Sequence, residues 1–99
     1  MRPGKRDHKH SILITGAELQ ELQRHSYMMA ESFGLDNRID RYKGKRPIGL
    51  YRWDLECLLA VIEATLADKD EHPSQDSPEY QALSSLNQRL INEYRTHYG

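Results

Sequence analysis

The stretch YRWDLECLLAVIEATLA, residues 51–67, decides the fold because, coiled as a helix, it is apolar around most of its circumference. Its main stripe recurs at the three- and four-residue spacing of one helix face: Leu55, Leu58, Leu59, Ile62 and Leu66. Smaller or branched apolar residues widen that stripe: Cys57, Ala60, Val61, Ala64 and Ala67. A helix that is apolar on most sides is buried on most sides, so this segment predicts either a central helix or a subunit interface.

A second helix is predicted upstream, over residues 16–33. In the sequence T-G-A-E, the Thr15 hydroxyl can accept from the Glu18 amide while the Glu18 carboxylate reaches back to the Thr15 amide, which is a capping box. Apolar residues then continue at helical spacing as far as Phe33. Gly34 follows with the positive φ that a helix C-cap prefers.

A third helix is predicted over residues 78–97, after an acidic linker that contains two prolines. Ser77 is a favoured N-cap residue, and Pro78 is favoured at the first helical position. The inward face is traced by four residues at helical spacing: Leu83, Leu86, Leu90 and Tyr94. The capping residues and the apolar spacing both indicate a long amphipathic helix.

The segments outside these helices leave alternatives open. Residues 34–50 can form a short helical segment that Asp36 caps and that runs through Tyr42, or a small hairpin that turns at Gly44. The apolar patch 12–14 can lie against the core or pair as a minimal strand. Residues 1–11 are basic and show no periodicity, so they are expected to form a flexible tail.

The fold class expected from these patterns is all-α. We expect a three-helix bundle with helices at about 16–33, 51–67 and 78–97, in a single helical domain over residues 12–99. A long, partly structured loop joins the first two helices. Because three helices in 99 residues cover a nearly all-apolar helix only in part, a homodimer is also expected.

Composition and charge limit the cellular compartments and the kinds of site that the protein can have. The formal net charge is −1, yet residues 1–52 carry +5 and residues 53–99 carry −6. Cys57 is the single cysteine, which excludes an intrachain disulfide and a cysteine-based zinc site and favours a reducing compartment. No apolar run reaches the roughly 20 residues of a membrane-spanning helix or the roughly 7–15 of a secretory signal. We therefore expect a cytoplasmic protein without a membrane partner.

The stretch RYKGKRPIGLYR, residues 41–52, is the strongest candidate for binding a polyanion or an acidic partner. Basic side chains interleaved with aromatic ones suit phosphate backbones and stacked bases. The basic candidates in and before it are Arg38, Arg41, Lys43, Lys45, Arg46 and Arg52. The alternative is a solvated connection that Ile48 and Leu50 anchor to the core.

Aromatic residues and methionine also suggest a protein interface. Tyrosine and methionine are enriched at interface centres, and methionine repacks easily against different partners. The candidates are Tyr27, Met28, Trp53, Tyr80, Tyr94 and Tyr98. Each of them can instead pack within the core.

No pattern indicates catalysis, a cofactor or a metal. Cys57 lies in an apolar run, where a reactive thiolate is disfavoured, and no phosphate-binding glycine motif occurs. His8 and His10 form an H-x-H pair in the tail, which offers little preorganisation for a metal, and His25, His72 and His97 lie on different segments without metal-ligand spacing. All five are expected to be solvated. The sequence predicts a non-catalytic protein-interaction or adaptor module. The alternative is a nucleic-acid-associated regulator that binds through the basic loop 38–52.

Overall fold

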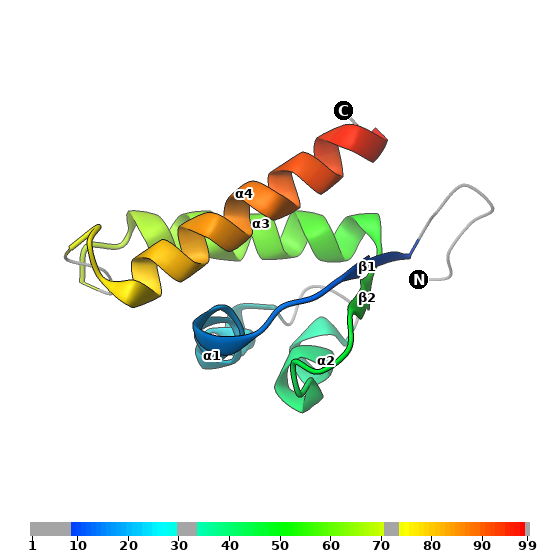
Figure 1. Cartoon of the computed structure of the whole chain (residues 1–99), viewed down its shortest axis with the longest axis horizontal. Helices are drawn as coiled ribbons and strands as arrows, with labels where there is room; N and C mark the ends of the chain where they lie inside the picture. Colours follow the sequence, from blue (N-terminus) through cyan, green and yellow to red (C-terminus); the bar gives the residue numbers. More distant parts are fainter. Residues whose placement is uncertain (1–8, 30–33, 71–73, 99) are drawn as a thin grey trace.

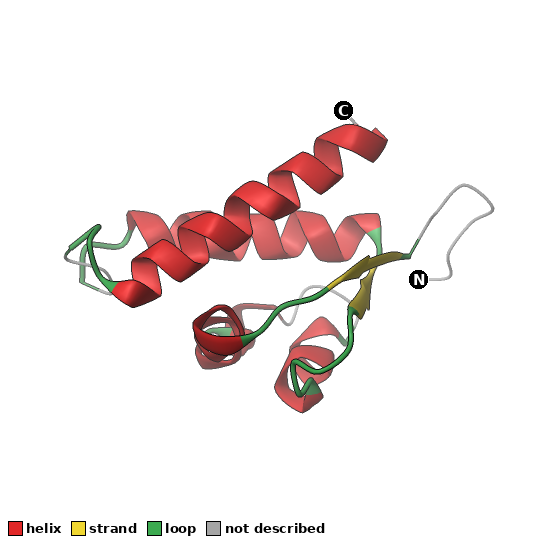
Figure 2. Cartoon of the chain, in the orientation of Figure 1, coloured by secondary structure: helices red, strands yellow, loops and turns green. Residues whose placement is uncertain are grey.

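The computed structural model describes residues 9–29, 34–70 and 74–98. In chain order these form β1 His10–Ile12, α1 Gly16–Arg24, the 3-10 helix η1 Ser26–Met29, α2 Leu35–Arg41, β2 Ile48–Leu50, α3 Arg52–Ala67 and α4 Pro78–Tyr98 (Figures 1 and 2). The fold is a mostly helical globule with four α-helices and a two-stranded antiparallel sheet in these residues. The expected pure three-helix bundle is therefore wrong, although the mostly helical character of the fold is confirmed.

The predicted helix over residues 51–67 is confirmed as α3, but it is not buried on most sides, because Ala60, Glu63 and Ala64 are exposed. Helix α4 packs along α3, and η1 and β2 also contact α3 (Figure 1). Leu55, Leu58 and Ile62 are almost completely buried. Burial of each such side chain stabilises the fold by roughly 1.5–3 kcal/mol. Part of the cover that was expected from a second subunit thus comes from short elements of the same chain.

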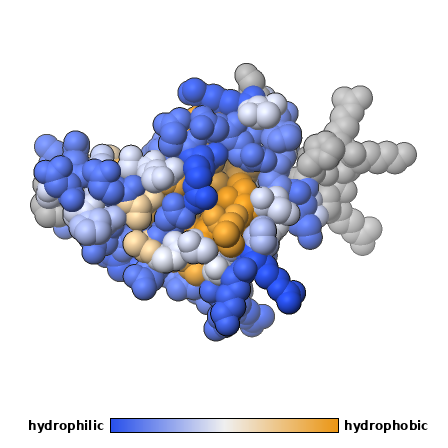
Figure 3. Space-filling model, viewed as in Figure 1, coloured by the Kyte–Doolittle hydropathy of each residue, from blue (hydrophilic) through white to orange (hydrophobic). Residues whose placement is uncertain are grey.

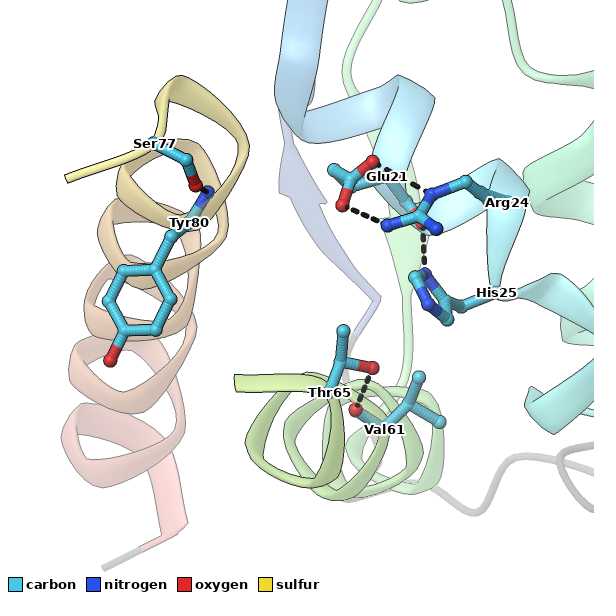
Figure 4. A network of polar contacts seen from close by, with 7 residues as sticks. All are labelled: Glu21, Arg24, His25, Val61, Thr65, Ser77 and Tyr80. Atoms are coloured by element: carbon cyan, nitrogen blue, oxygen red, sulfur yellow. Dashed lines mark hydrogen bonds and ion pairs between the residues drawn. The ribbon is translucent and has the colours of Figure 1, made fainter. Parts of the chain in front are cut away.

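The helix predicted over residues 16–33 ends earlier, at Arg24. The amide of His25 bonds to the carbonyls of both Glu21 and Leu22, at 3.2 and 3.1 Å, which tightens the last turn toward 3-10 geometry. The buried His25 ring also donates through Nδ1 to the Glu21 carbonyl at 2.9 Å (Figure 4). The chain continues as η1 to Met29, and Phe33 lies outside the described residues.

The predicted capping box at the start of α1 does not form. The Thr15 side chain makes no capping hydrogen bond, and Gly16 at the first helical position has a φ of 57°. The Glu18 carboxylate instead accepts a bond from Arg89 of α4 at 2.6 Å. A long-range ion pair therefore replaces the local cap, and it ties α1 to α4.

The connection after Gly34 contains a helix and a strand. The alternative of a short helix is confirmed by α2, in which Leu35 and Ile39 are buried, but its N-cap is Gly34 and Asp36 lies in its first turn. Strand β2 pairs antiparallel with β1, in the register His10 to Leu50 and Ile12 to Ile48. The apolar patch at Ile12 therefore pairs as a strand, and β1 begins at His10, inside the expected tail, because main-chain bonds to β2 hold it.

The third predicted helix is confirmed as α4, which extends to Tyr98. Its start is capped as expected, since the Tyr80 amide donates to the Ser77 hydroxyl at 3.1 Å (Figure 4). Leu83, Leu86 and Leu90 are buried along its inner face. The sequence pattern and the capping geometry thus agree for this element.

A buried carboxylate joins α2, β2 and the start of α3. Asp54 is fully buried, and its Oδ2 accepts from Arg38 Nη1 at 2.9 Å and from the Tyr51 amide at 3.0 Å. Arg38 also donates through Nη2 to the carbonyl of Gly49. Arg38 of α2 and Asp54 of α3 therefore hold strand β2, which lies between these helices in the sequence.

Removal of the partner of this buried charge should destabilise the protein strongly. We expect Arg38→Ala to lower the free energy of unfolding by about 3 kcal/mol, because Asp54 keeps an uncompensated buried charge. Arg41→Ala, on the same helix with an exposed side chain, should change it by less than about 0.5 kcal/mol. Urea denaturation followed by circular dichroism measures both, and equal effects would contradict the assigned role of Arg38.

The turn at Gly44 should tolerate a side chain less well than Gly34 does. Both glycines have left-handed backbone, with φ of 73° and 83°, but a Cβ on Gly44 would lie 3.1 Å from a methyl of Leu19 and 3.2 Å from the Ile14 carbonyl oxygen. Gly34 has open space there. We expect Gly34→Ala to cost about 1 kcal/mol and Gly44→Ala about 2–3 kcal/mol in unfolding experiments. The reverse order would show that the turn is built differently.

Candidate functional site

A basic pocket of about 590 Å³ lies against α2, the turn that follows it and strand β2. Its basic side chains come from separate segments of the chain: Lys9, Arg38, Arg41 and Arg46. Two aromatic residues, Tyr42 and Tyr51, contribute to the same lining, together with Pro47 and Ile48. The pocket thus combines positive charge with flat apolar groups.

The structure divides the six predicted basic residues into two groups. Arg38, Arg41 and Arg46 line the pocket, whereas Lys43, Lys45 and Arg52 do not. Arg52 instead forms an exposed pair with Glu56, with 3.5 Å between Nε and Oε1. The six basic side chains therefore do not form a single binding surface, because only three of them line the pocket.

Lys9 is a pocket residue that was not among the six predicted basic candidates, although it belongs to the basic segment 1–11. It precedes β1, whose register places Ser11 opposite Gly49 and His10 opposite Leu50. A Cβ added to Gly49 would lie 2.3 Å from Cδ of Lys9. The absence of a side chain at Gly49 thus leaves room for the Lys9 stem to lie over β2. Lys9 could have been placed at the pocket only by predicting that residues 10–12 pair with residues 48–50.

The charges around the pocket are only partly balanced. Asp54 offsets Arg38, whereas no ion pair within the described residues involves Lys9, Arg41 or Arg46. The turn that carries Arg46 is held by the Tyr42 hydroxyl, which donates to the Arg46 carbonyl at 2.5 Å. As far as the described residues show, these three cations are available to an anionic ligand.

The aromatic side of the pocket is also held in place. The ring of Tyr51 stacks on that of Trp53, with centroids 4.9 Å apart and planes inclined by 16°. Tyr42 accepts the Ile14 amide through its hydroxyl at 3.3 Å. Both tyrosines are therefore positioned before any ligand binds, which lowers the entropy lost on binding.

The six predicted interface residues are spread over the molecule. Tyr27 and Met28 of η1 are exposed by 72% and 38%, and they border a hollow of about 80 Å³ beside Thr65. Trp53 and Tyr80 lie in the first turns of α3 and α4, while Tyr94 and Tyr98 pack partly against the core at the end of α4. Figure 3 shows an apolar patch among mostly hydrophilic side chains on the visible face.

The expectation of solvated histidines is wrong for His10 and His25, which are both buried. His10 lies beside Glu93 and His97 of α4, which are 83 and 87 positions away in the sequence. His97 is exposed, and His8 and His72 lie outside the described residues. Spacing along the chain gave no sign of this cluster, because β1 brings His10 to α4 only in the folded protein.

Comparison with family models, curated proteins and solved structures gave no match for this chain. No helix in the described ranges is long and apolar enough to span a membrane. Cys57, the single cysteine, is half-buried within α3. The pocket and the clusters of polar side chains are therefore the features that bear on function.

Proposed function

We propose that the protein is a non-catalytic module that binds the phosphate backbone of single-stranded nucleic acid in the basic pocket. The observation that carries this proposal is the convergence of Lys9, Arg41 and Arg46 on one pocket without ion-pair partners among the described residues. Neutralisation of phosphates by such side chains supplies most of the affinity in non-specific nucleic-acid binding.

The aromatic lining favours a single strand as the ligand. Exposed bases stack on aromatic rings, and each such contact is worth roughly 1–3 kcal/mol. Tyr51, whose ring stacks on that of Trp53, places an aromatic ring in the same pocket as the cations. A volume of about 590 Å³ lies within the range of small-ligand sites, so it suits a nucleotide unit.

A pair of matched charge reversals tests the pocket. Arg41→Glu with Arg46→Glu should weaken binding of a fluorescent oligothymidylate at least tenfold, because both side chains line the pocket. Lys43→Glu with Lys45→Glu carries the same charge change in the same segment but lies outside the lining. It should weaken binding only about two- to threefold through long-range charge. Fluorescence anisotropy at low salt measures both affinities.

The salt dependence gives a second measure of the same contacts. If three phosphates are neutralised, the logarithm of the binding constant should fall with the logarithm of salt concentration with a slope of about −2. No binding at low salt would contradict the proposal. So would equal losses in the two charge-reversed variants, because the pocket would then play no particular part.

The exposed residues of η1 support a second function, self-association as an interaction module. Tyr27 and Met28 are adjacent, and both expose large side chains beside the hollow next to Thr65. Residues of these types are enriched at the centres of protein interfaces. We propose that a second copy of the chain covers them.

Sedimentation equilibrium tests this second proposal. The wild-type protein should show concentration-dependent dimers, and Tyr27→Ala with Met28→Ala should shift it to monomers by removing the apolar contact area. Leu13→Ala is the matched control, because Leu13 is also an exposed apolar residue but lies between β1 and α1. A wild-type protein that stays monomeric, or a control that dissociates equally, would contradict this interface.

A further inference from the structure

A cluster of metal-ligating groups lies where β1 meets the end of α4. Nδ1 of His10 is 3.1 Å from Oε1 of Glu93, and Nε2 of His97 is 3.4 Å from the same oxygen. The rings of His10 and His97 have centroids 4.5 Å apart. One ligand atom from each of the three residues lies within 4.8 Å of the other two. Two distant ends of the chain thus present three ligands to one point.

The spacing of these atoms fits a small tetrahedral ion. Zinc binds nitrogen and oxygen at about 2.0–2.2 Å, so neighbouring ligands of a tetrahedral site are about 3.3 Å apart. The two distances to Glu93 Oε1 lie on either side of that value. Glu93 and His97 are one turn apart on α4 and share a face, while His10 approaches from β1. The ligating nitrogens of the two histidines lie within 4.8 Å of each other, and they would approach to about 3.3 Å in the zinc-bound site.

The surroundings of His10 hold its ring in a ligating orientation. The ring is buried, and its Nε2 lies 2.6 Å from the hydroxyl of Tyr98. Zinc-bound histidines typically use their second nitrogen as a donor to an outer partner, which fixes the tautomer and the ring plane. Without zinc, Nδ1–H donates to Glu93 and Nε2 accepts from the Tyr98 hydroxyl. When Nδ1 binds zinc, the ring proton moves to Nε2, which then donates to Tyr98.

The ligand set also indicates which ion would bind. Two imidazoles and one carboxylate form a donor set that zinc accepts, whereas magnesium and calcium prefer oxygen ligands alone. Glu93 and His97 are partly exposed, by 36% and 42% of their side chains. Solvent can therefore reach the site, and a water molecule can supply the fourth ligand.

We propose that His10, Glu93 and His97 bind one zinc ion, which fastens strand β1 to α4. Without zinc, Glu93 accepts a hydrogen bond from His10 and lies 3.4 Å from Nε2 of His97, so the ligands are assembled before the ion arrives. Such preorganisation lowers the cost of binding. Because the site exists only in the folded chain, zinc should stabilise the folded state.

Calorimetric titration of the metal-free full chain with zinc tests the proposal. The wild-type protein should bind one equivalent, and its melting temperature should rise by roughly 10 °C at zinc concentrations about 100 times the dissociation constant. The imidazole resonances of His10 and His97 should shift together in nuclear magnetic resonance spectra. Absence of both the binding heat and the rise in melting temperature would overturn the proposal.

Three variants locate the ion. His97→Ala removes an exposed side chain, so the metal-free protein should melt near the wild-type temperature, yet zinc affinity should fall at least tenfold. Tyr98→Phe removes the outer partner of His10 and should weaken zinc binding about tenfold or more. His8→Ala is the control for the neighbouring tail histidine and should bind as the wild type does. Equal binding by His97→Ala and the wild type would place the ion elsewhere and refute the site.

Discussion

The structure depends on the burial of one helix that has little polar surface of its own. In α3, Leu55, Leu58 and Ile62 form one buried face, which Val61 and Thr65 widen to one side. Helix α4 covers one side, and η1 and β2 contact it elsewhere. The small sheet thus helps to keep the apolar side chains of α3 from water. Shorter elements that contact α3 take the place of a third long helix.

The polar contacts at the start of α3 determine where the functional groups lie. Asp54 holds Arg38, and Arg38 holds the strand through Gly49, so the floor of the basic pocket is fixed from within the core. Strand β1 then contributes to two separate places. Lys9 lies over β2 at the pocket, whereas the next residue, His10, reaches the end of α4. Alternation along a strand accounts for this division.

The sequence predicted what depends on local periodicity and missed what depends on distant contacts. Helices α3 and α4 and the Ser77 cap follow from spacing and residue type, and α2 was one of two alternatives for its segment. The end of α1 could not be predicted, because His25 ends it through a buried ring, and neither could the pairing of residues 10–12 with 48–50. Half of the basic candidates reach the pocket, and Lys9 was missed for the same reason.

Native-state hydrogen exchange measures the burial of α3 most directly. At dilutions where sedimentation shows a monomer, the amides of residues 55–65 should be the slowest in the protein, with protection that approaches the global free energy of unfolding. The same protection should hold without zinc or nucleic acid. Fast exchange of these amides in the monomer would contradict the account, because α3 would then need a second chain to cover it.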